Sequence, residues 1–162
     1  MEDNVFKILG AIVIAILVFL CFIPLIVRNR TEEKIRRHIH ELASNSLEIT
    51  PEELLELREA TLKNGKYGKI ADDFVGVYII FNETQNLYYV GQAKKVLQRV
   101  AHHFSGHGNG DVYADYKYGD EFTIKTIAFS TSGYDSLDKL EKDTIDTYDA
   151  YSEGYNKTRG NS

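Results

Sequence analysis

The sequence is short of cysteine and of net positive charge, and each shortage excludes a class of function. Cys21 is the only cysteine among 162 residues, so one chain can form neither an internal disulfide nor a cysteine-based zinc site. Residues 72–162 carry nine Lys and Arg against fourteen Asp and Glu, whereas residues 1–71 carry ten of each. A protein that holds the DNA backbone unaided usually presents a basic face. This charge balance does not indicate one.

Several familiar ligand-binding motifs are also missing. The sequence has no zinc-finger or helix-turn-helix signature, and the glycine-rich segment 106–110 lacks the Lys-Ser/Thr ending of a P-loop. We therefore expect 106–110 to be a flexible loop that does not open a helix. The histidines of segment 102–107 have no acidic residue at a familiar spacing, which disfavours a transition-metal site.

Long apolar sequence occurs only at residues 8–27, which are twenty residues without a charge. About 20 apolar residues span the hydrocarbon of a bilayer, so this segment predicts one transmembrane helix. A cleaved signal peptide is the alternative, but its apolar core is only about 7 to 15 residues long and ends at a small-residue cleavage site. Five Lys and Arg follow the segment within residues 28–37. This asymmetry predicts a single-pass protein of the inner (cytoplasmic) membrane with its C-terminal part in the cytoplasm.

The chain after this anchor, which we take as residues 1–30, predicts a helical linker at 31–71 and a domain at 72–162. A charged helix is expected over residues 31–43. A second helix starts at Pro51, because Thr50 and Glu53 form a capping box around it. The helices of residues 31–63 are either a stalk that docks on the following domain, which we favour, or a surface for a protein partner.

The domain shows the pattern of a small α/β fold. Apolar and β-branched runs predict strands at 75–81, 87–91 and 121–129, and apolar stripes at helical spacing predict helices at 94–104 and 136–150. The order β-β-α-β-α suits a three-stranded, mostly antiparallel sheet flanked by helices. The tyrosines of 111–118 fit the edge of a small core, or alternatively a surface that stacks on bases.

A few polar residues interrupt these apolar patterns. Tyr78 shares one face of its strand with a glycine, and Arg99 and His103 share one side of a helix. Glu141 lies within the apolar stripe of the last helix, where a carboxylate is costly unless it is paired or binds a metal. Taken alone, Glu141 favours a structural salt bridge over a metal site, and Asn156 is a turn residue.

Together these residues resemble the signature of the GIY-YIG nuclease superfamily. The tripeptides GVY at 76–78 and YVG at 89–91 are similar to the GIY and YIG motifs, with Val for Ile in both. The two tyrosines are eleven residues apart, and the spacings of the remaining polar residues are also similar to those of homing endonucleases and restriction enzymes of the family. The resemblance covers about half of the chain and rests on six positions: Tyr78, Tyr89, Arg99, His103, Glu141 and Asn156.

The resemblance implies hydrolysis of phosphodiester bonds at one divalent ion, Mg²⁺ or Mn²⁺, held by Glu141. It implies Tyr78 as the general base with Tyr89 nearby, and Arg99 on the phosphate. His103 would relay a proton or bond to Tyr78, and Asn156 would organise the site.

Three functions are therefore open. The first, which we favour, is a membrane-anchored endonuclease that acts on nucleic acid, on DNA in preference to RNA. The second is a catalytically idle module that binds nucleic acid or protein at the membrane. The third is a structural membrane protein whose helices at 31–63 recruit a partner.

Overall fold

The computed structural model describes residues 2–63 and 73–160. Within its helices, the side chains of residues 2–9, 11–18, 21, 25 and 60–63 lie outside this description. The chain forms two compact units, residues 1–37 and residues 38–162.

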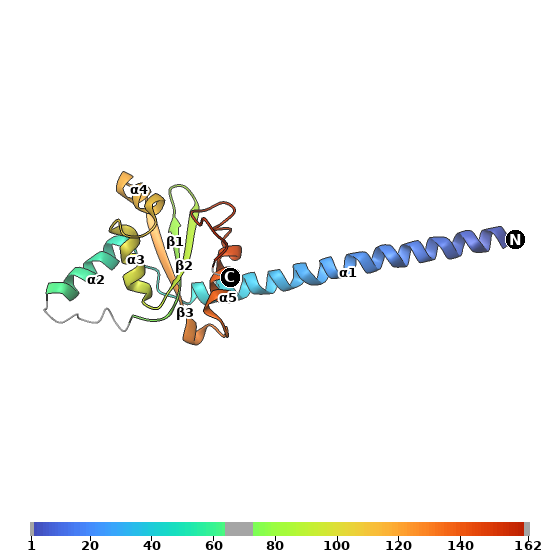
Figure 1. The fold of residues 1–162 in the computed structure, drawn as a ribbon, viewed down its shortest axis with the longest axis horizontal. Helices are drawn as coiled ribbons and strands as arrows, with labels where there is room; N and C mark the ends of the chain where they lie inside the picture. The colour runs from blue at the N-terminus through green and yellow to red at the C-terminus, as the bar shows by residue number, and fades with distance from the viewer. Residues whose placement is uncertain (1, 64–72, 161–162) are drawn as a thin grey trace. The chain divides into compact units, whose positions relative to one another are not determined.

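The first unit is part of one long helix, α1 (Glu2–Ser44), whose last turns belong to the second unit (Figure 1). This helix includes the charged segment that the sequence predicted at 31–43. In the part of the chain that the structure describes, no helix is long and apolar enough to cross a membrane. The structure therefore does not support the anchor predicted at 8–27, most of whose side chains are outside the described set.

A three-stranded antiparallel sheet forms the centre of the second unit, as the sequence predicted. Its strands are β1 (Gly76–Asn82), β2 (Leu87–Ala93) and β3 (Phe122–Ala128), in the order β2-β1-β3. β1 and β2 form a hairpin in which Tyr78 lies opposite Gly91, and β1 pairs with β3 on its other side. Among the described residues β2 therefore lies at the edge of the sheet, where one row of its backbone groups has no strand partner.

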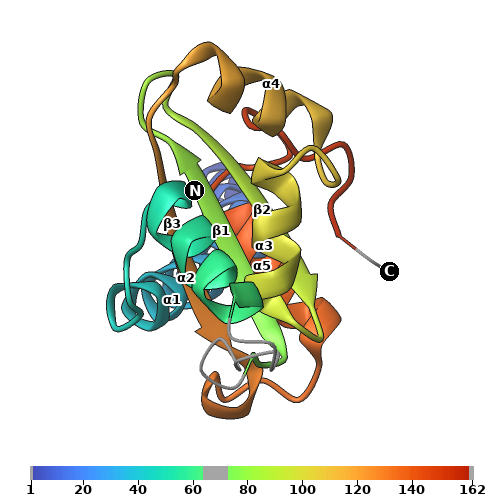
Figure 2. The same ribbon diagram turned by 90° about the vertical axis from the view of Figure 1, so that its left-hand side faces the viewer.

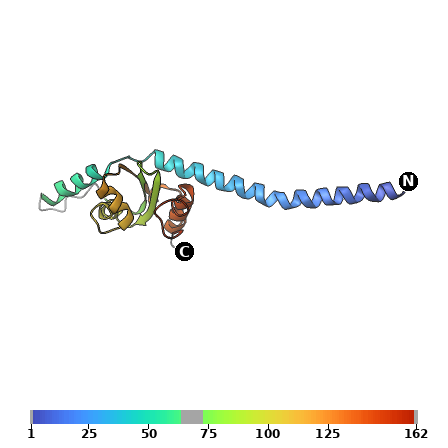
Figure 3. The same ribbon diagram turned by 90° about the horizontal axis from the view of Figure 1, so that it is seen from above.

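Helices cover both faces of this sheet. The helices are α2 (Pro51–Lys63), α3 (Val96–Phe104), α4 (Gly110–Tyr118) and α5 (Leu137–Thr147), with a short 3₁₀ turn η1 (Phe129–Thr131) after β3. Figures 2 and 3 show α2, α3 and α4 on one side of the sheet and α5 on the other. The start of α2 is the predicted capping box: the Thr50 amide donates to the Glu53 carboxylate (2.8 Å), and the Glu53 amide donates to the Thr50 hydroxyl (3.3 Å). Residues 64–72, which follow α2, lie outside the described residues.

Helix α4 was missed by the sequence analysis, which expected a flexible loop at 106–110 that opens no helix. That expectation is wrong, since the Asn109 side chain accepts hydrogen bonds from the amides of Asp111 and Val112 and so caps a helix that begins at Gly110. The helix ends at Gly119, which has the left-handed conformation (φ 100°) typical of a helix C-terminus. Apolar periodicity could not identify α4, because Val112 is its only buried residue.

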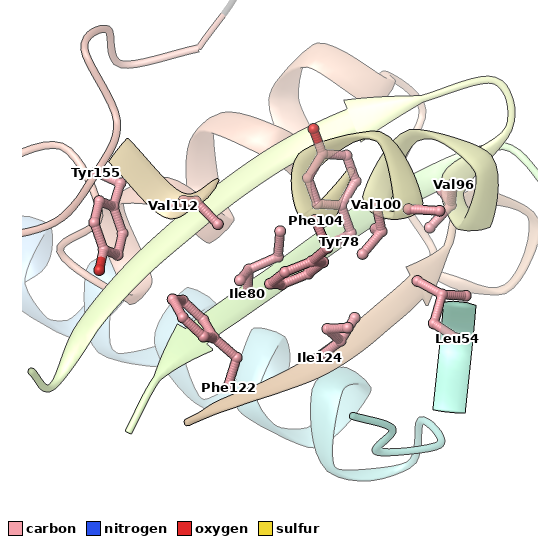
Figure 4. Packing of buried hydrophobic residues seen from close by; sticks show 11 residues of the cluster. Leu54, Tyr78, Ile80, Val96, Val100, Phe104, Val112, Phe122, Ile124 and Tyr155 are labelled. Carbon is pink, nitrogen blue, oxygen red and sulfur yellow. The ribbon is translucent and has the colours of Figure 1, made fainter. Parts of the chain in front are cut away.

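The main core lies between the sheet and the helices α2, α3 and α4 (Figure 4). Tyr78 and Ile80 of β1 pack there with Val100 and Phe104 of α3. Tyr116 of α4 lies edge-on to Phe104 and Phe122, so it packs at the core edge, whereas Tyr118 is 89% exposed.

The end of α1, the segment that follows it and the start of α2 all belong to the second unit and pack within it. Ile39 and Ala43, near the end of α1, are buried, and His40 lies edge-on to Tyr148. Ile49 forms an antiparallel bridge with Ile124 of β3, and Leu54 of α2 is fully buried in the core. These contacts attach α2 to the sheet.

Candidate functional site

The β1–β2 hairpin positions the first element of the site, the hydroxyl of Tyr78. Tyr78 is 1% exposed, and its ring crosses directly over its strand partner Gly91. A Cβ atom at position 91 would lie 2.3 Å from the Tyr78 oxygen, well inside van der Waals contact. Gly91 is therefore needed because the phenol occupies the space of any side chain there. In Figure 4 the Tyr78 hydroxyl points away from Ile80 and Ile124 of the core.

Helix α3 adds His103, which is fully buried beside this phenol. The Tyr78 oxygen and His103 Nε2 are 3.0 Å apart, a hydrogen-bond distance. The other ring nitrogen, Nδ1, accepts a hydrogen bond of 2.8 Å from the backbone N–H of Asn109. Both polar atoms of this buried imidazole therefore have partners, as burial requires.

Tyr89 and Arg99 complete the group on this face of the sheet. The Tyr89 ring centroid lies 4.8 Å from that of His103 and 6.1 Å from that of Tyr78. Arg99 is one helical turn before His103 on α3, as its spacing predicted, but its side chain is exposed whereas His103 is buried. Four of the six predicted site residues thus lie together.

The electrostatics of this group follow from burial beside one cation. Burial raises the pKa of Tyr78, and the neighbouring Tyr89 raises it further, while Arg99 acts in the opposite direction. Burial also raises the pKa of Tyr89, against the effects of Tyr78 and Arg99. Burial, together with the positive charge of Arg99, lowers the pKa of His103 to about 4. At neutral pH the site therefore contains two neutral phenols and a neutral imidazole beside the Arg99 guanidinium.

The remaining two predicted residues, Glu141 and Asn156, reach the same hairpin at the edge of β2. The Asn156 side chain accepts a hydrogen bond from the Val90 amide (2.9 Å) and donates one to the Val90 carbonyl (2.8 Å). It replaces a missing neighbouring strand at this point. Next to it, the Tyr155 amide donates to the Tyr88 carbonyl (2.9 Å). Asn156 is therefore more than a turn residue, because it pairs with the backbone between Tyr89 and Gly91.

Glu141 of α5 is 7% exposed. It binds Gln92, which lies two residues after Val90 on the same edge of β2. Its Oε1 accepts from the Gln92 amide (3.1 Å), and its Oε2 accepts from the Gln92 side-chain amide (3.0 Å). The Glu141 charge also raises the pKa of Tyr89, by less than burial does. The site thus consists of two groups joined by β2.

The chemistry of these donors fits a hard divalent cation. Carboxylate and hydroxyl oxygens are the ligands that Mg²⁺ prefers, and Mg²⁺ usually keeps several waters when a protein offers one or two carboxylates. Among the described residues no group of three or more His, Cys, Asp and Glu side chains could hold a metal. The ring centroids of His102 and His107 are 6.2 Å apart.

Three contributors to the site were not identified from the sequence: Gln92, Gly108 and Asn109. Gln92 acts through its contact with Glu141, which is distant in sequence, and Asn109 through its backbone N–H. Gly108 acts through the absence of a side chain, since a Cβ atom there would lie 2.5 Å from His103 Nδ1. The only available signal was the position of Gln92, directly after the second tripeptide.

Comparison with protein families agrees with this geometry. A family model described as the GIY-YIG catalytic domain matches residues 74–156, slightly more than half of the chain. No curated protein and no solved structure gives a significant match.

Proposed function

The chain belongs to the GIY-YIG family, whose catalytic domain is that of a nuclease, and we propose that it hydrolyses phosphodiester bonds in DNA with one divalent ion while anchored to a membrane. The observation that carries the catalytic part of this proposal is the buried Tyr78 hydroxyl, 3.0 Å from His103 Nε2 and placed over Gly91.

In this proposal Tyr78 is the general base that takes a proton from the attacking water, and Tyr89 orients that water. A base must first lose its own proton, and burial of Tyr78 opposes that loss. Positive charge is therefore needed at the site. Arg99 supplies part of it, and its guanidinium would also hold the scissile phosphate and the charge that develops on it.

Glu141 would hold the divalent ion, Mg²⁺ or Mn²⁺. GIY-YIG nucleases generally use divalent metal ions. When bound, the ion would stabilise negative charge on the leaving oxygen. Asn156 and Gln92 would keep the edge of β2, and with it Tyr89, at a constant distance from the Glu141 carboxylate.

The proposed anchor rests on the apolar sequence of residues 8–27 and on the basic residues that follow it. The large apolar side chains described in this segment are exposed: Phe19, Leu20, Phe22, Ile23, Ile26 and Val27. We place residues 38–162 on the cytoplasmic side. Because residues 72–162 carry a net negative charge, the basic segment 28–37 would be the part of the chain that attracts a polyanion.

Cleavage by the full-length chain in detergent micelles tests this proposal. Plasmid DNA, single-stranded DNA and RNA are incubated with Mg²⁺ or Mn²⁺, and DNA is expected to be cut. Glu141→Gln should abolish cutting, whereas Asp146→Asn removes an exposed carboxylate from the same helix and should not. Absence of cleavage of all three substrates by folded wild-type protein would refute the proposal.

The acidic charge of residues 72–162 disfavours unaided binding of nucleic acid, and so favours a second candidate in which the domain is catalytically idle and binds protein at the membrane. Exposed Leu47 and Leu57, which line a hollow beside α2, would then form part of a protein-binding surface in the 31–63 segment. Calorimetry separates the two candidates, because an idle site would not bind Mg²⁺ or Mn²⁺ at millimolar concentration.

A further inference from the structure

We propose that Asn109 is a positioning residue, which holds the neutral His103 ring in the tautomer whose Nε2–H donates a hydrogen bond to the Tyr78 oxygen. This inference rests on the proposed role of Tyr78 as a base. It assigns a function to residues 105–109, the segment between α3 and α4, which we call the return loop.

The return loop is shaped to place one backbone N–H on the imidazole. After α3 ends, the His107 amide donates to the His102 carbonyl (2.9 Å), which turns the chain back toward its own helix. Gly108 then passes so close to His103 that a Cβ atom there would lie 2.5 Å from Nδ1. The Asn109 N–H follows at 2.8 Å from the same nitrogen.

The Asn109 side chain holds this backbone in place. Its Oδ1 accepts hydrogen bonds from the Asp111 amide (2.9 Å) and the Val112 amide (3.1 Å), and its Nδ2 lies 3.4 Å from the Tyr155 carbonyl. The residue therefore connects the start of α4, the chain next to Asn156 and the ring of His103. Loss of the side chain would leave the N–H present but no longer directed at Nδ1.

A backbone N–H can only donate, so His103 Nδ1 must be an acceptor without a hydrogen. In a neutral imidazole the single hydrogen is then on Nε2, and the 3.0 Å contact is a donation from His103 to the Tyr78 oxygen. Burial keeps the pKa of His103 near 4, so the ring remains neutral at physiological pH.

The direction of this hydrogen bond determines whether His103 helps or hinders a base at Tyr78. A hydrogen bond donated to the phenol oxygen stabilises its phenolate form, which must exist before the oxygen can take a proton from water. In the opposite tautomer Nε2 would accept the phenol hydrogen and hold it on Tyr78. With Asn109 in place, His103 cannot pass a proton between its two nitrogens, so of the two roles expected for His103 this inference favours the hydrogen bond to Tyr78 over the proton relay.

Nitrogen NMR of the full-length chain in micelles, labelled with ¹⁵N-histidine, measures the tautomer directly. The chain has five histidines, and His103 is assigned by the signals that disappear in His103→Gln. Above pH 6 we expect Nε2 to carry the hydrogen and Nδ1 to carry none. A hydrogen on Nδ1 would overturn the inference.

Variants test whether Asn109 is the cause. In Asn109→Ala we expect the ring to exchange between tautomers and kcat to fall about tenfold with KM little changed, the effect of one hydrogen bond. Asn109→Ser retains a capping oxygen and should restore both the single tautomer and the wild-type kcat. Thr50→Ala, which removes the cap of α2 instead, should lower stability without changing the tautomer.

An unchanged tautomer and unchanged kcat in folded Asn109→Ala would overturn the role of Asn109. If Asn109→Ala does not fold, the comparison of Asn109→Ser with wild type replaces it, and a different tautomer in the capped variant would count against the role. The NMR experiment needs no activity, so a chain with the Nε2–H tautomer that cuts no nucleic acid would refute the proposed nuclease function and leave the inference intact. A chain that cuts DNA but carries the His103 hydrogen on Nδ1 would support the nuclease function and refute the inference.

Discussion

Gly91→Ala perturbs the proposed base without removing any polar group of the site. The new methyl carbon would lie 2.3 Å from the Tyr78 oxygen, whereas ordinary contact begins at 3.4 Å. The phenol must therefore shift by about 1 Å, because the opposing backbone is fixed in the β1–β2 ladder. A shift of this size breaks the 3.0 Å contact with His103.

The expected effect is large on activity and moderate on stability. Misplacement of a reacting group by 1 Å costs about 10²-fold in rate, and overpacking costs about 1 to 3 kcal/mol in the free energy of unfolding. Initial rates of plasmid cutting at saturating Mg²⁺ measure the first, and chemical denaturation measures the second.

Gly110→Ala is the matched control, since a Cβ atom there would contact nothing within 4 Å. It should leave both cutting and stability close to wild type. A Gly91→Ala variant that is folded and cuts DNA at the wild-type rate would refute the argument that the position of the Tyr78 hydroxyl governs catalysis.

Three further outcomes follow from the described contacts. Because folding lowers the pKa of His103 from 6.5 to about 4, the unfolded chain takes up a proton on this ring at a higher pH than the folded chain does, and the free energy of unfolding should fall by about 3 kcal/mol as the pH drops from 6.5 to 4. His103→Gln should flatten that part of the plot of stability against pH. An unchanged slope would contradict the buried neutral ring. Asn156→Ala should lower the free energy of unfolding by about 1 to 3 kcal/mol and speed hydrogen exchange of the Val90 amide, because both Val90 backbone groups lose their partner. If the Val90 amide stayed protected from exchange, another group would have to bind this edge of β2. Glu53→Ala should lower the free energy of thermal unfolding by about 1 kcal/mol through loss of the capping box, whereas Glu56→Ala, at an exposed position of the same helix, should not. Equal effects of the two variants would argue against the cap.

Helix α4 and the contacts of Glu141 could not be predicted from sequence patterns. Asn109 and Gly119 are ordinary helix-ending residues, yet with a single buried apolar residue between them they give no periodic stripe to recognise. Glu141 stood out within an apolar stripe, but its spacing could not show what it contacts. The answer, the amide of Gln92, is 49 residues away in sequence.

The strands, most of the helices and the six signature residues could be predicted from the sequence, because apolar periodicity, capping boxes and tripeptide spacings are properties of neighbouring residues. How those residues act on one another depends on the packing of distant segments. Strand register placed Tyr78 over Gly91, and the unpaired edge of β2 set the positions of Asn156 and Glu141. The return loop directed a backbone N–H at His103. These arrangements depend on hydrogen bonds of backbone groups that every sequence contains, so their direction becomes defined only when distant segments meet.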